Sequence, residues 1–129
     1  MSSEDQTKKL IQMSDVHWKN GKRQESIDTL ADLIEKGETN VVVHFKLAER
    51  LGDEKQFEEQ ISVLNQAIRV LNDHHKTHSR TEELIIKAYL HMSVANKNLN
   101  QSTQARECLL KGQEYAKQDR FIETLKGEL

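Results

Sequence analysis

Apolar residues recur along the chain at helical spacing, in segments divided by short polar or glycine-containing turns. Start and stop signals of this kind predict six helices, at about 3–19, 23–36, 40–51, 54–73, 80–97 and from 103 onward. The segment at 80–97 has almost no polar face, which predicts a helix packed on several sides near the centre of the domain. The sequence therefore predicts an all-α fold.

Glycine and capping signals place the turns between these helices. Gly21, Gly37 and Gly52 follow the first three apolar segments, and glycine readily takes the left-handed conformation that ends a helix. Asp53, with Gln56 three residues later, has the spacing of a capping box. We expect this pair to open the fourth helix.

The pattern of large and small residues repeats at a fixed offset of 34 residues. The first set is Leu10, Met13, Ser14, His17, Ser26, Leu30 and Leu33, and the second is His44, Leu47, Ala48, Leu51, Gln60, Leu64 and Ala67. A third set follows after 45 residues, which is one period plus an 11-residue extension, and comprises Tyr89, Met92, Ser93, Asn96, Ala105, Leu109 and Gly112. Such a period is typical of stacked helix pairs.

These positions resemble a degenerate tetratricopeptide repeat. Ser14, Ala48 and Ser93 replace the glycine of the family pattern but remain small, and Ala105 keeps the first alanine of the second helix. The resemblance implies a right-handed superhelix of three antiparallel helix pairs and a C-terminal capping helix segment. The predicted single domain, 1–129, has repeats at about 5–38, 39–72 and 84–117 and a cap at about 118–129. An ordinary six-helix bundle is the alternative.

Composition agrees with helices and sets aside several functions. The chain has no proline, five glycines and a net charge of −2, with no basic stripe for a nucleic acid. Residues 1–65 carry 9 basic and 13 acidic groups, and residues 66–129 carry 10 and 8, so the halves have net charges of −4 and +2.

The single cysteine and the absence of long apolar runs bear on location. Cys108 has no disulfide partner within the chain and is expected to be a small buried apolar group. No apolar run reaches the roughly 18 residues of a membrane span. Met1–Thr7 is polar, unlike a secretion signal. We expect a cytoplasmic protein without membrane contact.

The family resemblance implies a binding scaffold whose first helices line a concave groove. Projection of those helices places in the groove Ile11, Asp15, Trp18, Val42, Phe45, Lys46, Glu49, Lys87, Leu90, His91 and Val94. The apolar members favour a peptide or amphipathic helix of a partner protein. Trp18, Phe45 and Leu90 could instead fill gaps between repeats. We expect a non-enzymatic adaptor without a cofactor.

Co-chaperone members of the family clamp a terminal carboxylate with lysine, arginine and asparagine side chains. The matching residues here are Ile11, Asp15, Lys46, Lys87 and His91, of which only Lys87 agrees. Asp15 would repel a carboxylate, so the sequence disfavours a receptor for chaperone tails.

The C-terminal segment has an apolar stripe with three alternative uses. Phe121, Ile122, Leu125 and Leu129 share one helical face. The stripe could cap the last repeat, pair with a second copy in a self-associating assembly module, or mark where a longer protein was cut.

Two further clusters of polar residues could in principle carry chemistry. His74, His75 and His78 could contribute to a metal site, but zinc needs more ligands than this solvated turn offers, so no metal is predicted. Glu25, Asp28, Asp32 and Glu35 form an acidic stripe, expected to be solvated or to meet a basic partner. A small helical regulatory enzyme remains the less favoured alternative, because no phosphate loop or activated nucleophile is recognisable.

Overall fold

The computed structural model describes the backbone of residues 3–73 and 80–128 and, within these ranges, the side chains up to residue 116. It contains α1 (Ser3–Lys19), α2 (Arg23–Glu35), α3 (Val41–Asp53), α4 (Phe57–Asp73), α5 (Thr81–Asn98) and α6 (Ser102–Glu128). No strand occurs in these described ranges. The predicted all-α class is confirmed.

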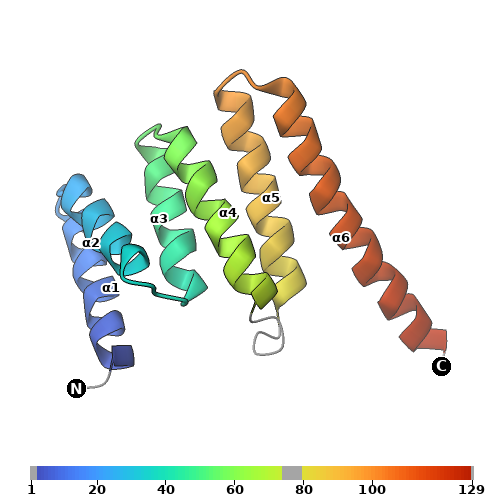
Figure 1. Cartoon of the computed structure of the whole chain (residues 1–129), viewed down its shortest axis with the longest axis horizontal. Coiled ribbons are helices and arrows are strands. Elements are labelled where there is room, and N and C mark those ends of the chain that lie inside the picture. The colour runs from blue at the N-terminus through green and yellow to red at the C-terminus, as the bar shows by residue number, and fades with distance from the viewer. Residues whose placement is uncertain (1–2, 74–79, 129) are drawn as a thin grey trace.

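The helices form three antiparallel pairs that stand side by side along one direction, from α1–α2 to α5–α6 (Figure 1). The first pair contacts the second through α2 and α3, and the second pair contacts the third through α4 and α5. This stacking of helix pairs agrees with the 34-residue repeat of the sequence. The right-handed sense of the superhelix stays a prediction.

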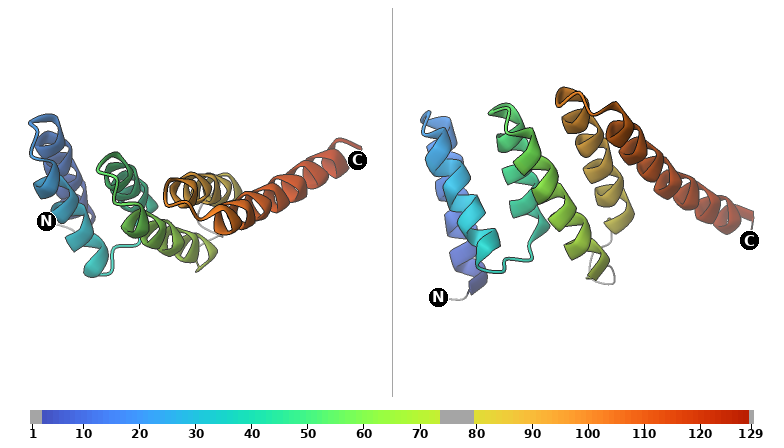
Figure 2. Two further views of the ribbon diagram at one scale, coloured as in Figure 1. Left: turned by 90° about the horizontal axis from the view of Figure 1, so that it is seen from above. Right: turned by 45° about the horizontal axis from the view of Figure 1, so that its top comes forward.

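The segment predicted as a C-terminal cap is the continuation of α6. Both views in Figure 2 show this end of the helix extending away from the other pairs rather than folding back across α5. The side chains of the stripe formed by Phe121, Ile122, Leu125 and Leu129 lie outside the described residues. The capping role therefore stays a prediction.

The first two turns follow the glycine signals. Gly21 and Gly37 have φ values of +80° and +93°, in the left-handed region that favours glycine. Beyond α1, the Lys22 backbone N–H donates to the His17 carbonyl at 2.8 Å, closing the helix end in the manner of a Schellman motif. These two predicted stops are confirmed.

The third turn differs from the prediction. Gly52 lies inside α3, and Lys55, with φ of 61°, takes the left-handed conformation instead. Asp53 is the last residue of α3, so the predicted capping box of Asp53 with Gln56 is wrong. Gly52 serves a close approach, because a Cβ atom there would lie 2.7 Å from Nε2 of Gln60.

Small residues lie where the paired helices come close, as the repeat pattern predicts. Ser14 and Ala48 are buried, and Ser93 is half-buried. Cys108 is buried as predicted, and the Asn96 side chain donates to its sulfur at 3.7 Å. Burial raises the pKa of the Cys108 thiol.

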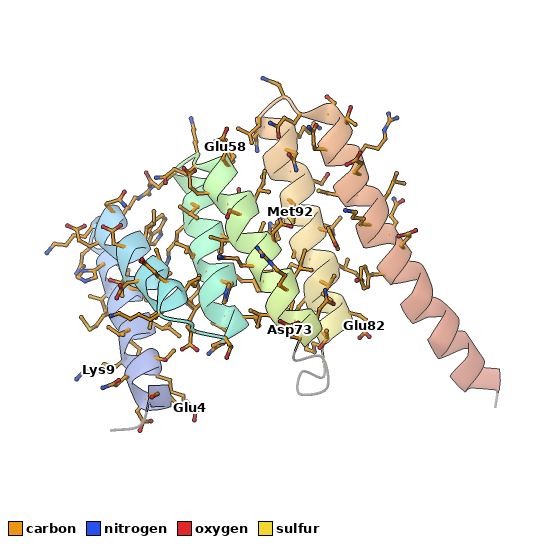
Figure 3. All side chains as sticks on the ribbon, viewed as in Figure 1. Glu4, Lys9, Glu58, Asp73, Glu82 and Met92 are labelled. Carbon is orange, nitrogen blue, oxygen red and sulfur yellow. The ribbon has the colours of Figure 1, made fainter. Side chains whose placement is uncertain are left out.

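The helix α5 is less enclosed than its sequence predicts. It packs against α4 and α6, and Met92 lies where α4 and α5 meet (Figure 3). Leu90 and Val94, however, are exposed. The expectation that nearly every side of this helix is covered is wrong, because no described element lies over that side.

Candidate functional site: a groove between α3 and α5

A cavity of about 800 Å³ opens between α3 and α5. Its lining residues are Asn40, Val41, Val42, Phe45, Lys46, Ala48, Glu49, Gln60, Leu64, Arg80, Leu84, Lys87 and His91. Six of the predicted groove residues are among them, all from α3 and α5. The second helix α4 also contributes, through Gln60 and Leu64, which a projection of first helices alone could not find.

The floor of the groove is apolar and continuous with the core. Val41, Ala48 and Leu64 are buried beneath it. Phe45 is half-buried and packs against both hydrophobic clusters, a large one that extends from α2 to α6 and a small one around Leu71 and Ile85. Phe45 therefore fills a gap between repeats and lines the groove at the same time, so the two interpretations of this residue are compatible.

The rim carries charges of both signs. The ammonium of Lys87 lies 5.2 Å from the ring centre of Phe45, a cation–π arrangement. No carboxylate among the described residues forms an ion pair with Lys87. Burial lowers the pKa of His91, and the Lys87 charge lowers it further, while Glu49 acts in the opposite direction. The imidazole is accordingly held neutral at pH 7.

A polar network that the projection of the helices did not predict lies at the groove end near α1. Arg50 of α3 is buried and donates to the hydroxyls of Ser14 and Ser26, the second at 2.9 Å, and to the carboxylate of Asp15. Lys46 donates to the same carboxylate at 3.2 Å. Asp15 is thus engaged within the fold.

The charge of Asp15 is compensated at this place. Burial acts to raise its pKa, but hydrogen bonds from Arg50 and Lys46, and their charges, outweigh burial and lower it. Asp15 therefore stays ionised and paired, and it does not stand in the groove as a free anion.

Trp18 belongs to the same network rather than to the open groove. The guanidinium of Arg23 lies 4.7 Å from its ring centre and that of Arg50 lies 5.5 Å from it. Trp18 and Ile11 also pack against the core. The structure thus places Ile11, Asp15, Trp18, Leu90 and Val94 outside the cavity.

The other candidate clusters add no site among the described residues. His74, His75 and His78 lie outside those residues, and the described part of the chain has no group of three metal-ligating side chains. The acidic stripe of Glu25, Asp28, Asp32 and Glu35 is exposed on α2, where Asp32 pairs with Lys36 at 2.8 Å. No described helix is long and apolar enough to cross a membrane.

Comparisons with known proteins agree with this architecture. The family model "Tetratricopeptide repeat" matches residues 86–119, which fall on α5 and α6. The solved N-terminal domain of stress-induced protein-1 (STI-1) from C. elegans superposes with a TM-score of 0.76 at 16% identity, over 95% of this chain and 94% of that one. The curated protein sequences give no match. The chain thus has the fold of a tetratricopeptide-like helical repeat domain, and the family model matches its last helix pair.

Proposed function

We propose that this domain is an adaptor that binds a peptide or amphipathic helix of a partner protein in the groove between α3 and α5. The observation that carries the proposal is the groove itself, about 800 Å³ with an apolar floor and charged groups only along its rim. A segment with apolar side chains on one face would place them on Phe45, Leu84 and the exposed Val42. Flanking polar residues would meet Glu49 and Lys87.

The mixed rim favours a segment read by apolar anchors over a terminal carboxylate. Lys46, one of the positions that would hold a carboxylate, is engaged by Asp15. Lys87 is left as the cation without an ion-pair partner in the described groove. One such cation can orient a ligand but supplies little affinity at an exposed rim, about 1 kcal/mol or less.

We further propose that the domain works by binding, without catalysis or a cofactor, and that it acts in the cytoplasm. The free, buried Cys108 fits a reducing compartment. Self-association through the C-terminal stripe is the alternative function. It predicts a mass that increases with concentration and is lowered by Leu125→Lys.

The test is to select peptides from a random library on the intact domain and measure their affinities by calorimetry. Val42→Glu adds a charge to the groove at an exposed position near the start of α3, so the fold should tolerate it. We expect Val42→Glu to weaken the selected peptides at least about tenfold, or 1.4 kcal/mol. Phe45→Ala should do the same, with melting curves recorded because Phe45 also packs in the core.

Leu110→Glu is the matched control, since Leu110 is an exposed apolar residue on α6 outside the groove. Its affinity should equal that of the unmodified domain. Peptides that bind both groove variants with full affinity would place the binding surface elsewhere and remove the proposal.

A further inference from the structure

Large apolar side chains are exposed at both ends of the stack of helix pairs. Met13 and Val16 lie on α1, Leu90 and Val94 on α5, and Leu109 on α6. Met13 and Val16 form the N-terminal face, and Leu90, Val94 and Leu109 form the C-terminal face. The internal repeat explains why these residues are exposed.

The N-terminal face is the surface by which one helix pair packs on the preceding pair. Met13 is 45% exposed, whereas its equivalents, Leu47 at an offset of 34 and Met92 at a further 45, are 3% and 5% exposed. Both equivalents belong to the large core cluster. Met13 therefore presents a packing position that no element of the described residues covers.

The C-terminal face is the opposite surface, on which a following pair packs. Leu109 is 40% exposed, while its equivalents Leu30 and Leu64 are fully buried at 0%. Leu90 is exposed too, and its equivalent Phe45 is half-buried against the next pair. The two ends thus carry the two halves of the junction that the chain forms twice within itself.

We propose that the N-terminal face of one copy of this chain packs on the C-terminal face of another, in the geometry of the internal junctions. The occupant of each end is then a second copy of the chain. The contacts of the internal junctions can be transferred position by position to the junction between copies.

The transferred contacts at the centre of the junction are apolar or small. Within the chain, Arg50 reaches Ser26 across the first junction, at 2.9 Å. The corresponding residues between copies are Val16 of one and Ala105 of the other. An exposed valine would thus pack on a small, half-buried residue, and no charge is buried there.

The residue pairs on the groove side of the junction are also compatible with contact between two copies. The ion pair of Lys46 with Asp15 becomes Gln12 beside Val94 between copies. The contact of Lys87 with Phe45 becomes the stem of Lys8 over Leu90. Neither pair brings like charges together, and a lysine stem can cover a leucine while its ammonium stays in water.

The helices at the two ends are electrically balanced. The first helix α1 has three acidic and three basic residues, and α6 has five of each. No net charge therefore opposes contact between the N-terminal face of one copy and the C-terminal face of another. Because the two surfaces differ, the contact is heterologous, and copies can add without closing a symmetric dimer.

The experiment uses two variants that each block one end. Met13→Lys blocks the N-terminal face and Leu109→Lys the C-terminal face, and both sites are exposed enough to leave the fold intact, as circular dichroism would check. Leu110→Lys, an equal charge change one residue away from the C-terminal face, is the control. Sedimentation velocity would follow the mass from about 10 µM to about 1 mM, a range that detects weak contacts.

We expect the unmodified chain and Leu110→Lys to exceed the monomer mass of 15.0 kDa as concentration rises. Met13→Lys and Leu109→Lys should each remain monomeric alone, but an equimolar mixture should form a dimer and stop there, since one open face of each kind remains. An unmodified chain that stays monomeric throughout would overturn the proposal. So would association of either blocked variant alone, which would point to a symmetric contact or to the C-terminal stripe.

Discussion

Removal of the Arg50 side chain should destabilise the fold more than any other single truncation of a charged residue among those described. Arg50 crosses from α3 to the first helix pair and donates to Ser14, Ser26 and Asp15, and its guanidinium lies over Trp18. Arg50→Ala cuts all of these contacts at once. The substitution also leaves a void where the buried arginine stem packed.

The expected loss of stability depends on which polar groups lose their partner when the Arg50 side chain is removed. Breaking a buried ion pair costs about 3–5 kcal/mol when the remaining charge stays buried and unpaired. Here the Asp15 side chain is 43% exposed and keeps Lys46 as a partner. The hydroxyls of Ser14 and Ser26 still bond to each other at 2.9 Å. We therefore expect a loss of about 2–3 kcal/mol, or about 8–12 °C in melting temperature.

Urea unfolding followed by circular dichroism measures this loss, and Arg23→Ala is the matched control. Arg23 also lies over Trp18, but its ion pair with Glu54, at 2.7 Å, is exposed. Its truncation should cost about 1 kcal/mol or less. If Arg50→Ala cost no more than Arg23→Ala, the buried network would not stabilise the first junction and the reasoning would be refuted.

Three further predictions concern single positions. Burial lowers the pKa of His44 below its unfolded value near 6.5, so the native state binds fewer protons and the free energy of unfolding should fall as pH drops below about 6.5. The substitution His44→Leu, which installs the type of residue found at the equivalent Leu10, should flatten that pH dependence in unfolding measured between about pH 5 and 8. Gly52→Ala should stabilise the domain less in the unmodified chain than in a Gln60→Ala background, where the gain in helix propensity reaches up to about 1 kcal/mol, because the new Cβ must displace the end of the Gln60 side chain. Equal changes in urea unfolding in the two backgrounds would contradict this coupling. Cys108 should react with a thiol reagent far more slowly in the folded protein than in urea, and equal rates would show that its burial is wrong.

Local signals predicted most of the helix boundaries, and they failed where a glycine had another purpose. Gly21 and Gly37 end helices because both take positive φ. Gly52 has no such conformation and is small because Gln60 packs against it. A contact eight residues away along the chain, made only after α3 and α4 pair, cannot be inferred from the residues beside a glycine. Lys55, which takes the turn conformation, carries no turn signal.

The groove was predicted in part for a similar reason. Projection placed Val42, Phe45 and Lys87 in it correctly, because these positions depend only on helical period. It could not show that Asp15 and Trp18 are taken up by Arg50, since that network joins residues 24–36 apart in sequence. A signal was nevertheless present, because the positions equivalent to Arg50 hold apolar residues in the other two repeats. A lone arginine at such a position indicates a buried polar partner.

The single tryptophan is also a fluorescence probe of unfolding at one end of the stack of helix pairs. Trp18 lies against two guanidinium groups at the junction of the first and second helix pairs, and no tryptophan marks the second junction. Its fluorescence follows one end of the stack, whereas far-ultraviolet dichroism averages over all the helices. In a repeat array that frays from its ends, the two signals separate along a urea gradient, and their difference measures how strongly neighbouring pairs are coupled.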